Sequence, residues 1–135
     1  MLNYIEELKK LHLPEGQYAI FGSGPLAIRN IRASHDIDII VTKKLWKKLI
    51  EKYNTKIQSD PVSIKIGNIE IFYNWMELTD KIEEMINTAE IINELPFVQL
   101  KYVLEWKESM GREKDKKDIE LINKYLEKEK IKKVF

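Results

Sequence analysis

The chain contains no cysteine and only two histidines among its 135 residues. The lack of cysteine excludes disulfide bonds and metal sites made of thiolates. His35 has no second histidine at a ligand spacing, so we expect it to be a surface or hydrogen-bonding residue rather than a metal ligand.

Long apolar runs and a strong net charge are missing as well. No stretch approaches the ~20 apolar residues that span a bilayer, and Met1–Glu7 lack the basic start and apolar core of a signal peptide. The formal net charge of +1 gives no global attraction to nucleic acid or anionic membranes, so any electrostatic steering must come from local patches. We expect a cytoplasmic protein with no membrane partner.

The composition is typical of a globular protein, with 44% hydrophobic and 33% charged residues. One domain is expected over residues 1–135, with a sheet core at about 18–75 and a helical part at about 78–130. The patterns predict strands at Tyr18–Phe21, Asp36–Val41, Val62–Ile66, Ile69–Tyr73 and Ala89–Ile92. They predict helices near Leu2–Leu8, Leu26–Asn30, Lys43–Tyr53 (capped by Thr42), Leu78–Ile86, Phe97–Ser109 (opened by Pro96) and Lys114–Glu129. The fold class is therefore α+β, a mixed sheet flanked by helices.

Two aspartates, Asp36 and Asp38, stand in the strongly β-forming run that ends at Val41. Aspartate is depleted from strands, so two aspartates in one strand indicate a specific structural or functional role. Alternation turns both side chains to one side of the sheet, with Cα atoms about 6.5–7 Å apart. Two such carboxylates repel unless a cation lies between them, and Mg²⁺ or Mn²⁺ prefers their oxygens. A metal site and a solvent-facing strand end paired with lysines both remain open.

A turn of small residues, Gly22-Ser23-Gly24, follows the first expected strand and precedes Pro25, which suits a first helical turn. Small residues let a ligand approach the backbone, and a helix N-terminus offers N–H groups to a phosphate. The alternative is an ordinary turn.

The two segments together resemble the signature of the DNA polymerase beta-like nucleotidyltransferase superfamily. Phe21-Gly22-Ser23 is followed, after the twelve residues 24–35, by Asp36-Ile37-Asp38-Ile39. In that family a hydrophobic residue precedes Gly-Gly or Gly-Ser, and two aspartates follow in a strand about ten residues on. The resemblance covers residues 18–41 and implies a nucleotidyltransferase-like mixed sheet.

The resemblance also implies a third acid on a later strand, and Glu70 in Asn68-Ile69-Glu70-Ile71 is the matching candidate. Aspartate is more usual there, and an exposed edge glutamate is the alternative. By the mechanism that the resemblance implies, Asp36, Asp38 and Glu70 would be the catalytic, metal-binding carboxylates. They would promote transfer of a nucleoside monophosphate from a nucleoside triphosphate to an acceptor hydroxyl, with release of pyrophosphate.

A charged stretch farther on resembles one found in small nucleotidyltransferase proteins, including toxins of type IV toxin–antitoxin systems. The basic residues of this stretch are Lys107, Arg112 and Lys114. Together with Gly22, Ser23 and Arg32, they are the predicted nucleotide-binding residues. Asp115 and Asp118 would orient these bases, and the alternative is a set of solvated ion pairs. Arg29 is a further candidate for facing an anion.

Other interpretations of the sequence remain open. The chain has little room for an acceptor-binding domain, so a non-catalytic regulatory module with a protein partner, such as a toxin–antitoxin component, is the main alternative. An RNA-binding domain using the lysine-rich C-terminal helix is a weaker one, since acidic residues interrupt the lysines. Trp46, Trp75 and Trp106 are interpreted as packing residues. The acceptor, whether an RNA, a protein or a small molecule, is not identified.

Overall fold

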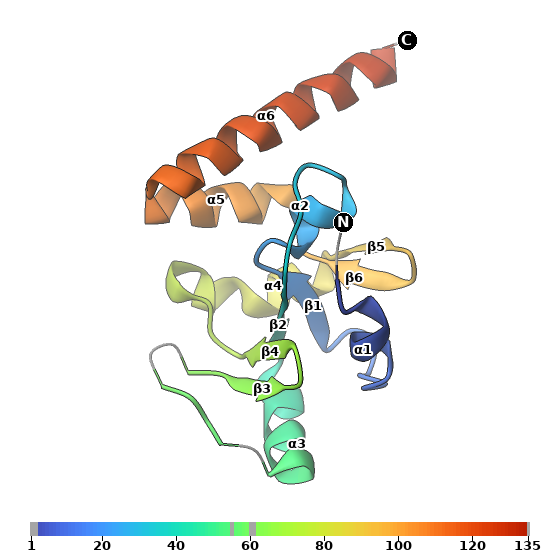
Figure 1. Ribbon diagram of the computed structural model, residues 1–135, viewed down its shortest axis with the longest axis vertical. Helices are drawn as coiled ribbons and strands as arrows, with labels where there is room; N and C mark the ends of the chain where they lie inside the picture. Colours follow the sequence, from blue (N-terminus) through green and yellow to red (C-terminus); the bar gives the residue numbers. More distant parts are fainter. Residues whose placement is uncertain (1–2, 55, 60–61, 135) are drawn as a thin grey trace.

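Apolar residues at alternate positions of several short segments build a central sheet, as the sequence predicts. The computed structural model describes residues 3–54, 56–59 and 62–134, and within them six strands form one mixed sheet (Figure 1). The strands are β1 (Tyr18–Phe21), β2 (Ile37–Val41), β3 (Ile64–Ile66), β4 (Ile69–Phe72), β5 (Glu90–Ile92) and β6 (Leu95–Phe97). Their order is β3-β4-β2-β1-β6-β5, in which the β2–β4 and β1–β6 pairs are parallel and the others antiparallel.

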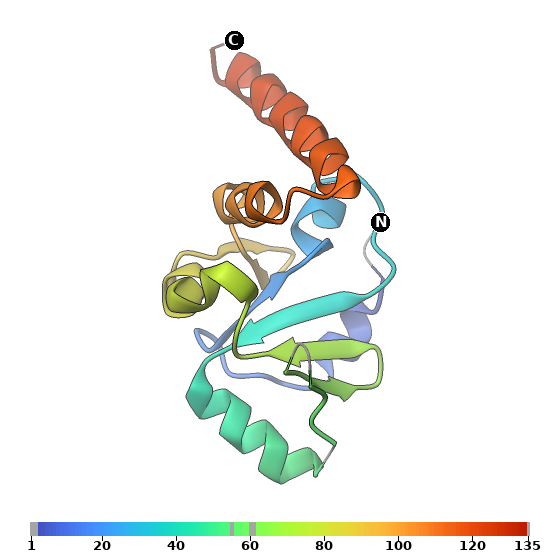
Figure 2. The same cartoon turned by 90° about the vertical axis from the view of Figure 1, so that its left-hand side faces the viewer.

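Helices cover both faces of this sheet. They are α1 (Ile5–Lys9), α2 (Gly24–Ile28), α3 (Lys43–Tyr53), the 3₁₀ helix η1 (Met76–Lys81), α4 (Ile82–Asn87), α5 (Leu100–Met110) and α6 (Glu113–Val134). Figure 2 shows α3 on one side of the sheet and α5 with α6 on the other. No helix of the described residues is long and apolar enough to cross a membrane. The expected α+β class, with helices around a mixed sheet, is confirmed.

Alternation within the strands divides the core into two clusters, one on each face. In β2, Ile39 packs with residues of α1 and α3, whereas Ile40 packs with residues of α4 and α5. Asp38 stands two residues before Ile40 in the same strand and therefore shares its face. This is the face on which the C-terminal helices pack, so helix side chains can approach the acidic strand.

Several element bounds differ from the sequence-based expectations. The second strand begins at Ile37, so Asp36 precedes it in a bend. Pro96 does not open a helix but lies in β6, and α5 begins only at Leu100. The backbone N–H of Val98 donates to Ile20 O at 3.0 Å, which keeps this segment extended beside β1.

The two ends of the chain also bear on the expectations. The last helix continues to Val134 instead of ending near Glu129, because its lysines and glutamates are good helix formers. Leu2, expected in the first helix, lies outside the described residues.

The start of α3 can be tested as a local determinant of the fold. Thr42 Oγ1 accepts a hydrogen bond from Leu45 N at 3.2 Å, as the predicted cap requires. We expect Thr42→Ala to lower the free energy of unfolding by about 1 kcal/mol, because a helix N–H loses its acceptor. Thr42→Ser, which keeps the hydroxyl, should retain most of that stability in urea denaturation. Equal losses in the two variants would contradict a capping role.

Candidate active site

The Gly22–Ser23 bend joins β1 to α2 and lies against the acidic strand. The antiparallel register pairs Phe21 with Asp38, so the bend follows directly beside that aspartate. Gly22 has a φ of +61°, and a Cβ there would lie only 2.7 Å from Asp38 Oδ2. Both the backbone conformation and the close approach therefore require glycine at this position.

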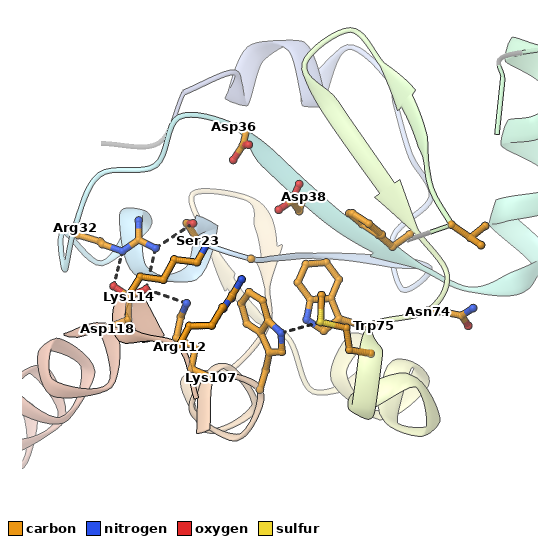
Figure 3. Close-up of a pocket in the computed structure, with 15 residues that line it drawn as sticks. Ser23, Arg32, Asp36, Asp38, Asn74, Trp75, Lys107, Arg112, Lys114 and Asp118 are labelled. Atoms are coloured by element: carbon orange, nitrogen blue, oxygen red, sulfur yellow. Dashed lines mark hydrogen bonds and ion pairs between the residues drawn. The ribbon is translucent and has the colours of Figure 1, made fainter. Parts of the chain in front are cut away.

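The three predicted carboxylates lie on the same side of the sheet. Asp38 in β2 is partly buried, Asp36 is exposed in the bend before it, and Glu70 in β4 is in parallel register with Asp38. All three line one small hollow of about 120 Å³. The three acids are thus neighbours at one edge of the sheet, and Figure 3 shows Asp36 and Asp38 side by side.

The electrostatics of Asp38 reflect this crowding. Burial raises the pKa of its carboxyl to about 7, and the charges of Asp36 and Glu70 add to the effect, opposed by Lys65. The acidic hollow therefore carries more negative charge than its surroundings stabilise, and a cation would relieve the repulsion.

Glu70 is held partly aside from the two aspartates. Its Oε2 accepts a hydrogen bond of 2.6 Å from the buried Ser63 hydroxyl. Within residues 3–54, 56–59 and 62–134, no three acidic or histidine side chains form a group ready to hold a metal ion. The acids are neighbours, but they do not form a preformed cage of protein ligands.

A larger cavity of about 320 Å³ opens on the other side of Asp36 and Asp38. It is lined by every predicted site residue except Glu70: Gly22, Ser23, Arg32, Asp36, Asp38, Lys107, Arg112 and Lys114. Figure 3 shows Asp38 of β2 and Asp36, just before this strand, facing the bases of the α5–α6 junction across this cavity. Arg29 is not part of it, because its guanidinium donates to Pro25 O and pairs with Glu90.

Two buried aspartates organise the basic wall. Asp118 accepts two hydrogen bonds from Arg32, at 2.7 and 2.9 Å, and lies 2.9 Å from Lys107 Nζ. Asp115 accepts from Arg112 Nε at 2.6 Å. Burial alone would raise the pKa of Asp118, but hydrogen bonds from Arg32 and Lys107 outweigh it and hold the pKa below its ordinary value. The contacts expected of Asp115 and Asp118 with the bases are therefore present.

The bases of the cavity differ in their exposure and in their further contacts. Arg32 also donates to Ser23 Oγ at 3.3 Å, which ties the basic wall to the glycine bend. Lys114 is exposed and has no ion-pair partner within the part of the chain that the structure describes. Lys107 is buried, with its Nζ 4.6 Å from the Trp106 ring centroid.

An aromatic end of the cavity was not predicted as part of the site. Trp75 and Trp106 pack as expected, with Trp75 stacked on Phe21 at 4.6 Å between centroids. They also line the cavity, together with Phe72, Asn74, Met76 and Val62. No sequence motif predicts that the two tryptophans line the cavity, because their positions depend on the path of the chain from β4 through η1 to α5.

The sequence matches no model of a known protein family and no curated protein. The geometry of the cavity is therefore the basis for any functional conclusion.

The Gly22 contact leads to a prediction with a matched control. Gly22→Ala and Gly16→Ala both place a Cβ at positive φ, but a Cβ at Gly16 meets nothing within 4 Å. We expect each to lose about 1–2 kcal/mol of stability from the backbone alone. Gly22→Ala should lose more, because Asp38 must also move, and the excess should vanish in the Gly22→Ala/Asp38→Ala double variant. Equal losses in urea denaturation would refute the contact.

The raised pKa of Asp38 predicts a pH dependence of stability in EDTA. Its folded pKa of about 7 lies above the ordinary 3.8, so the protonated carboxyl stabilises the fold. That contribution is complete below about pH 4 and is lost as the pH rises through 7. Asp38→Asn should therefore be more stable than the natural chain at pH 8, by on the order of 2–4 kcal/mol, and equal to it near pH 4.

The measurement is the difference in unfolding free energy between the two proteins across this pH range. Asp80→Asn, an exposed acid outside the large cavity, serves as the control. A difference that stays constant with pH would show that the Asp38 carboxyl ionises without a penalty.

Proposed function

We propose that the chain is a metal-dependent nucleotidyltransferase that moves a nucleoside monophosphate from a nucleoside triphosphate to an acceptor hydroxyl. One observation carries the proposal: an acidic strand and a basic helix junction face each other across one cavity, beside a glycine bend (Figure 3). A nucleoside triphosphate with its divalent cation is bound by both kinds of side chain, because basic residues bind the phosphate oxygens and carboxylates bind the cation.

The sheet topology supports assigning the fold to the DNA polymerase beta-like nucleotidyltransferases. Parallel pairing of β2 with β4 sets Asp38 and Glu70 in register on neighbouring strands. The antiparallel β1–β2 pair carries the glycine bend to the same end of the sheet. These are the positions that the sequence signature of that superfamily implies.

The bases would bind the phosphates in a prearranged geometry. Arg32 and Lys107 are held by Asp118, and Arg112 is held by Asp115, so little side-chain freedom is lost when an anion binds. Lys114 adds a mobile point charge at the open side. Ser23 Oγ, already in contact with Arg32, offers one more polar group.

The carboxylates fit a divalent cation such as Mg²⁺ or Mn²⁺. Asp36 and Asp38 would hold it, with Glu70 nearby. Burial, and then the charges of Asp36 and Glu70, raise the pKa of Asp38, and a bound cation would oppose this rise. Mg²⁺ is usually bound by one or two carboxylates plus substrate phosphates, so the lack of a preformed cage agrees with this ligand set. The bound ion would offset charge that develops on the phosphoryl oxygens.

The reaction forms a bond between the acceptor oxygen and the α-phosphorus and breaks the bond between the α-phosphorus and the bridging oxygen. Pyrophosphate leaves, and the acceptor hydroxyl loses its proton. Glu70 is the proposed proton acceptor, because it lines the small hollow on the far side of Asp36 and Asp38 from the bases. The acceptor would enter there, whether it belongs to an RNA, a protein or a small molecule.

The proposal is tested by incubating the protein with Mg²⁺ or Mn²⁺ and labelled nucleoside triphosphates. We expect cation-dependent triphosphate binding and transfer of label, and about a hundredfold loss of transfer in Asp38→Asn. The substitution removes the charge and keeps the shape. Glu120→Gln, an exposed change on α6 away from the cavity, is the control. Triphosphate binding that is equal in the natural chain and Asp38→Asn, with and without the cation, would reject the function.

A further inference from the structure

Two indole N–H groups at the aromatic end of the large cavity lack good hydrogen-bond acceptors. Trp75 Nε1 is buried and has no acceptor within the described part of the chain. Trp106 Nε1 donates only to the thioether sulfur of Met76, at 3.4 Å, and a thioether is a weak acceptor. Buried indole N–H groups are normally paired, so two poorly satisfied donors at one end of a cavity need an explanation.

The two donors belong to one wall. The ring centroids of Trp75 and Trp106 are 5.0 Å apart, and their planes are inclined by 72°. Both side chains line the cavity, and both are nearly buried, at 4% and 8% exposed. A planar ligand that reached this wall would first have to uncover the buried Trp75 N–H, and would then meet two neighbouring donors and no acceptor from either ring.

Met76 is the only side chain that engages either donor within the described residues, and it can move. It is 49% exposed, at the start of η1, with a φ of +46°. An exposed, unbranched methionine is readily displaced without disturbing the core. A ligand oxygen could therefore replace the sulfur as the acceptor of the Trp106 N–H.

The position of this wall fits one part of a nucleotide. Figure 3 shows Trp75 at the opposite end of the cavity from Arg32 and Lys114, with Asp36 and Asp38 between them. A nucleoside triphosphate with its phosphates at the bases and its α-phosphate near the aspartates would place its base at the indoles. Aromatic walls also stack on bases of any sequence, so the selection must come from the N–H groups.

We propose that the two indoles select purines with two neighbouring acceptors, the 6-oxo purines, over adenine. Guanine presents the acceptors O6 and N7 on one edge, whereas adenine presents one acceptor beside an amino donor. An amino group against an indole N–H leaves two donors facing each other. This inference rests on the proposed function and specifies the substrate of the same site.

The closest matched ligands are inosine triphosphate and ATP, which differ in bearing an oxygen or an amino group at C6 of the purine. Equilibrium binding with Mg²⁺ should favour inosine triphosphate and GTP over ATP by about tenfold, which corresponds to one well-formed hydrogen bond. Trp75→Phe and Trp106→Phe keep aromatic surface and remove the N–H, so each should bring this ratio close to one. Trp46→Phe makes the same change in the opposite core cluster and should leave the ratio intact.

A second measurement uses the natural chain and so does not depend on whether the variants fold. The protein has three tryptophans, so its ¹H–¹⁵N spectrum contains three indole signals. With Mg²⁺ and inosine triphosphate, the Trp75 and Trp106 signals should shift downfield as they gain an oxygen acceptor, while Trp46 stays in place. ATP should produce a smaller shift.

The outcomes separate this inference from the function on which it rests. If GTP, inosine triphosphate and ATP bind equally, or if ATP shifts the two indole signals as much as inosine triphosphate does, base selection is wrong and the transferase proposal stands. If no triphosphate binds in the presence of Mg²⁺, both are wrong. A preference that survives in both Trp75→Phe and Trp106→Phe would assign it to another group.

Discussion

The antiparallel register of β1 and β2 is the constraint on which the candidate site depends. It seats the Gly22 bend against Asp38, so closely that a Cβ at Gly22 would collide with the carboxylate. The bend, the acidic strand and, through the parallel β2–β4 pair, Glu70 are thereby fixed to one another by backbone hydrogen bonds. A shift of β2 by one residue would point the Asp38 side chain towards the apolar core cluster beneath α1 and α3.

A buried ion network completes the site from the other direction. Asp118 links Arg32, from the loop after α2, to Lys107 of α5, so the C-terminal helices are tied to the sheet at the cavity itself. Burying these charges costs free energy that apolar packing would not, and removal of one partner would leave the others uncompensated. In this structure the network fixes the positions of Arg32 and Lys107, two of the bases that line the cavity.

Much of this arrangement was accessible from local patterns. The strand alternation around Asp38, the Thr42 cap and the two strands on either side of residues 67–68 were predicted because each depends on neighbours in sequence. Pro96 misled the prediction, since a proline suits a first helical turn and here lies in β6. The aromatic end of the cavity could not be foreseen, because Trp75 and Trp106 have apolar surroundings typical of core residues and their shared wall arises from chain segments far apart.

The sequence by itself determined the α+β class and the alternation that turns acids to one face and isoleucines to the other. It also determined the glycine that a positive φ requires at Gly22. These depend on backbone geometry over a few residues. The tertiary structure alone decided that Asp118 pairs with both Arg32 and Lys107, and that Glu70 accepts a hydrogen bond from Ser63. It also decided that, among the described residues, the N–H groups of Trp75 and Trp106 find no good acceptor. Side-chain partners depend on distances between separate elements, which local patterns do not encode.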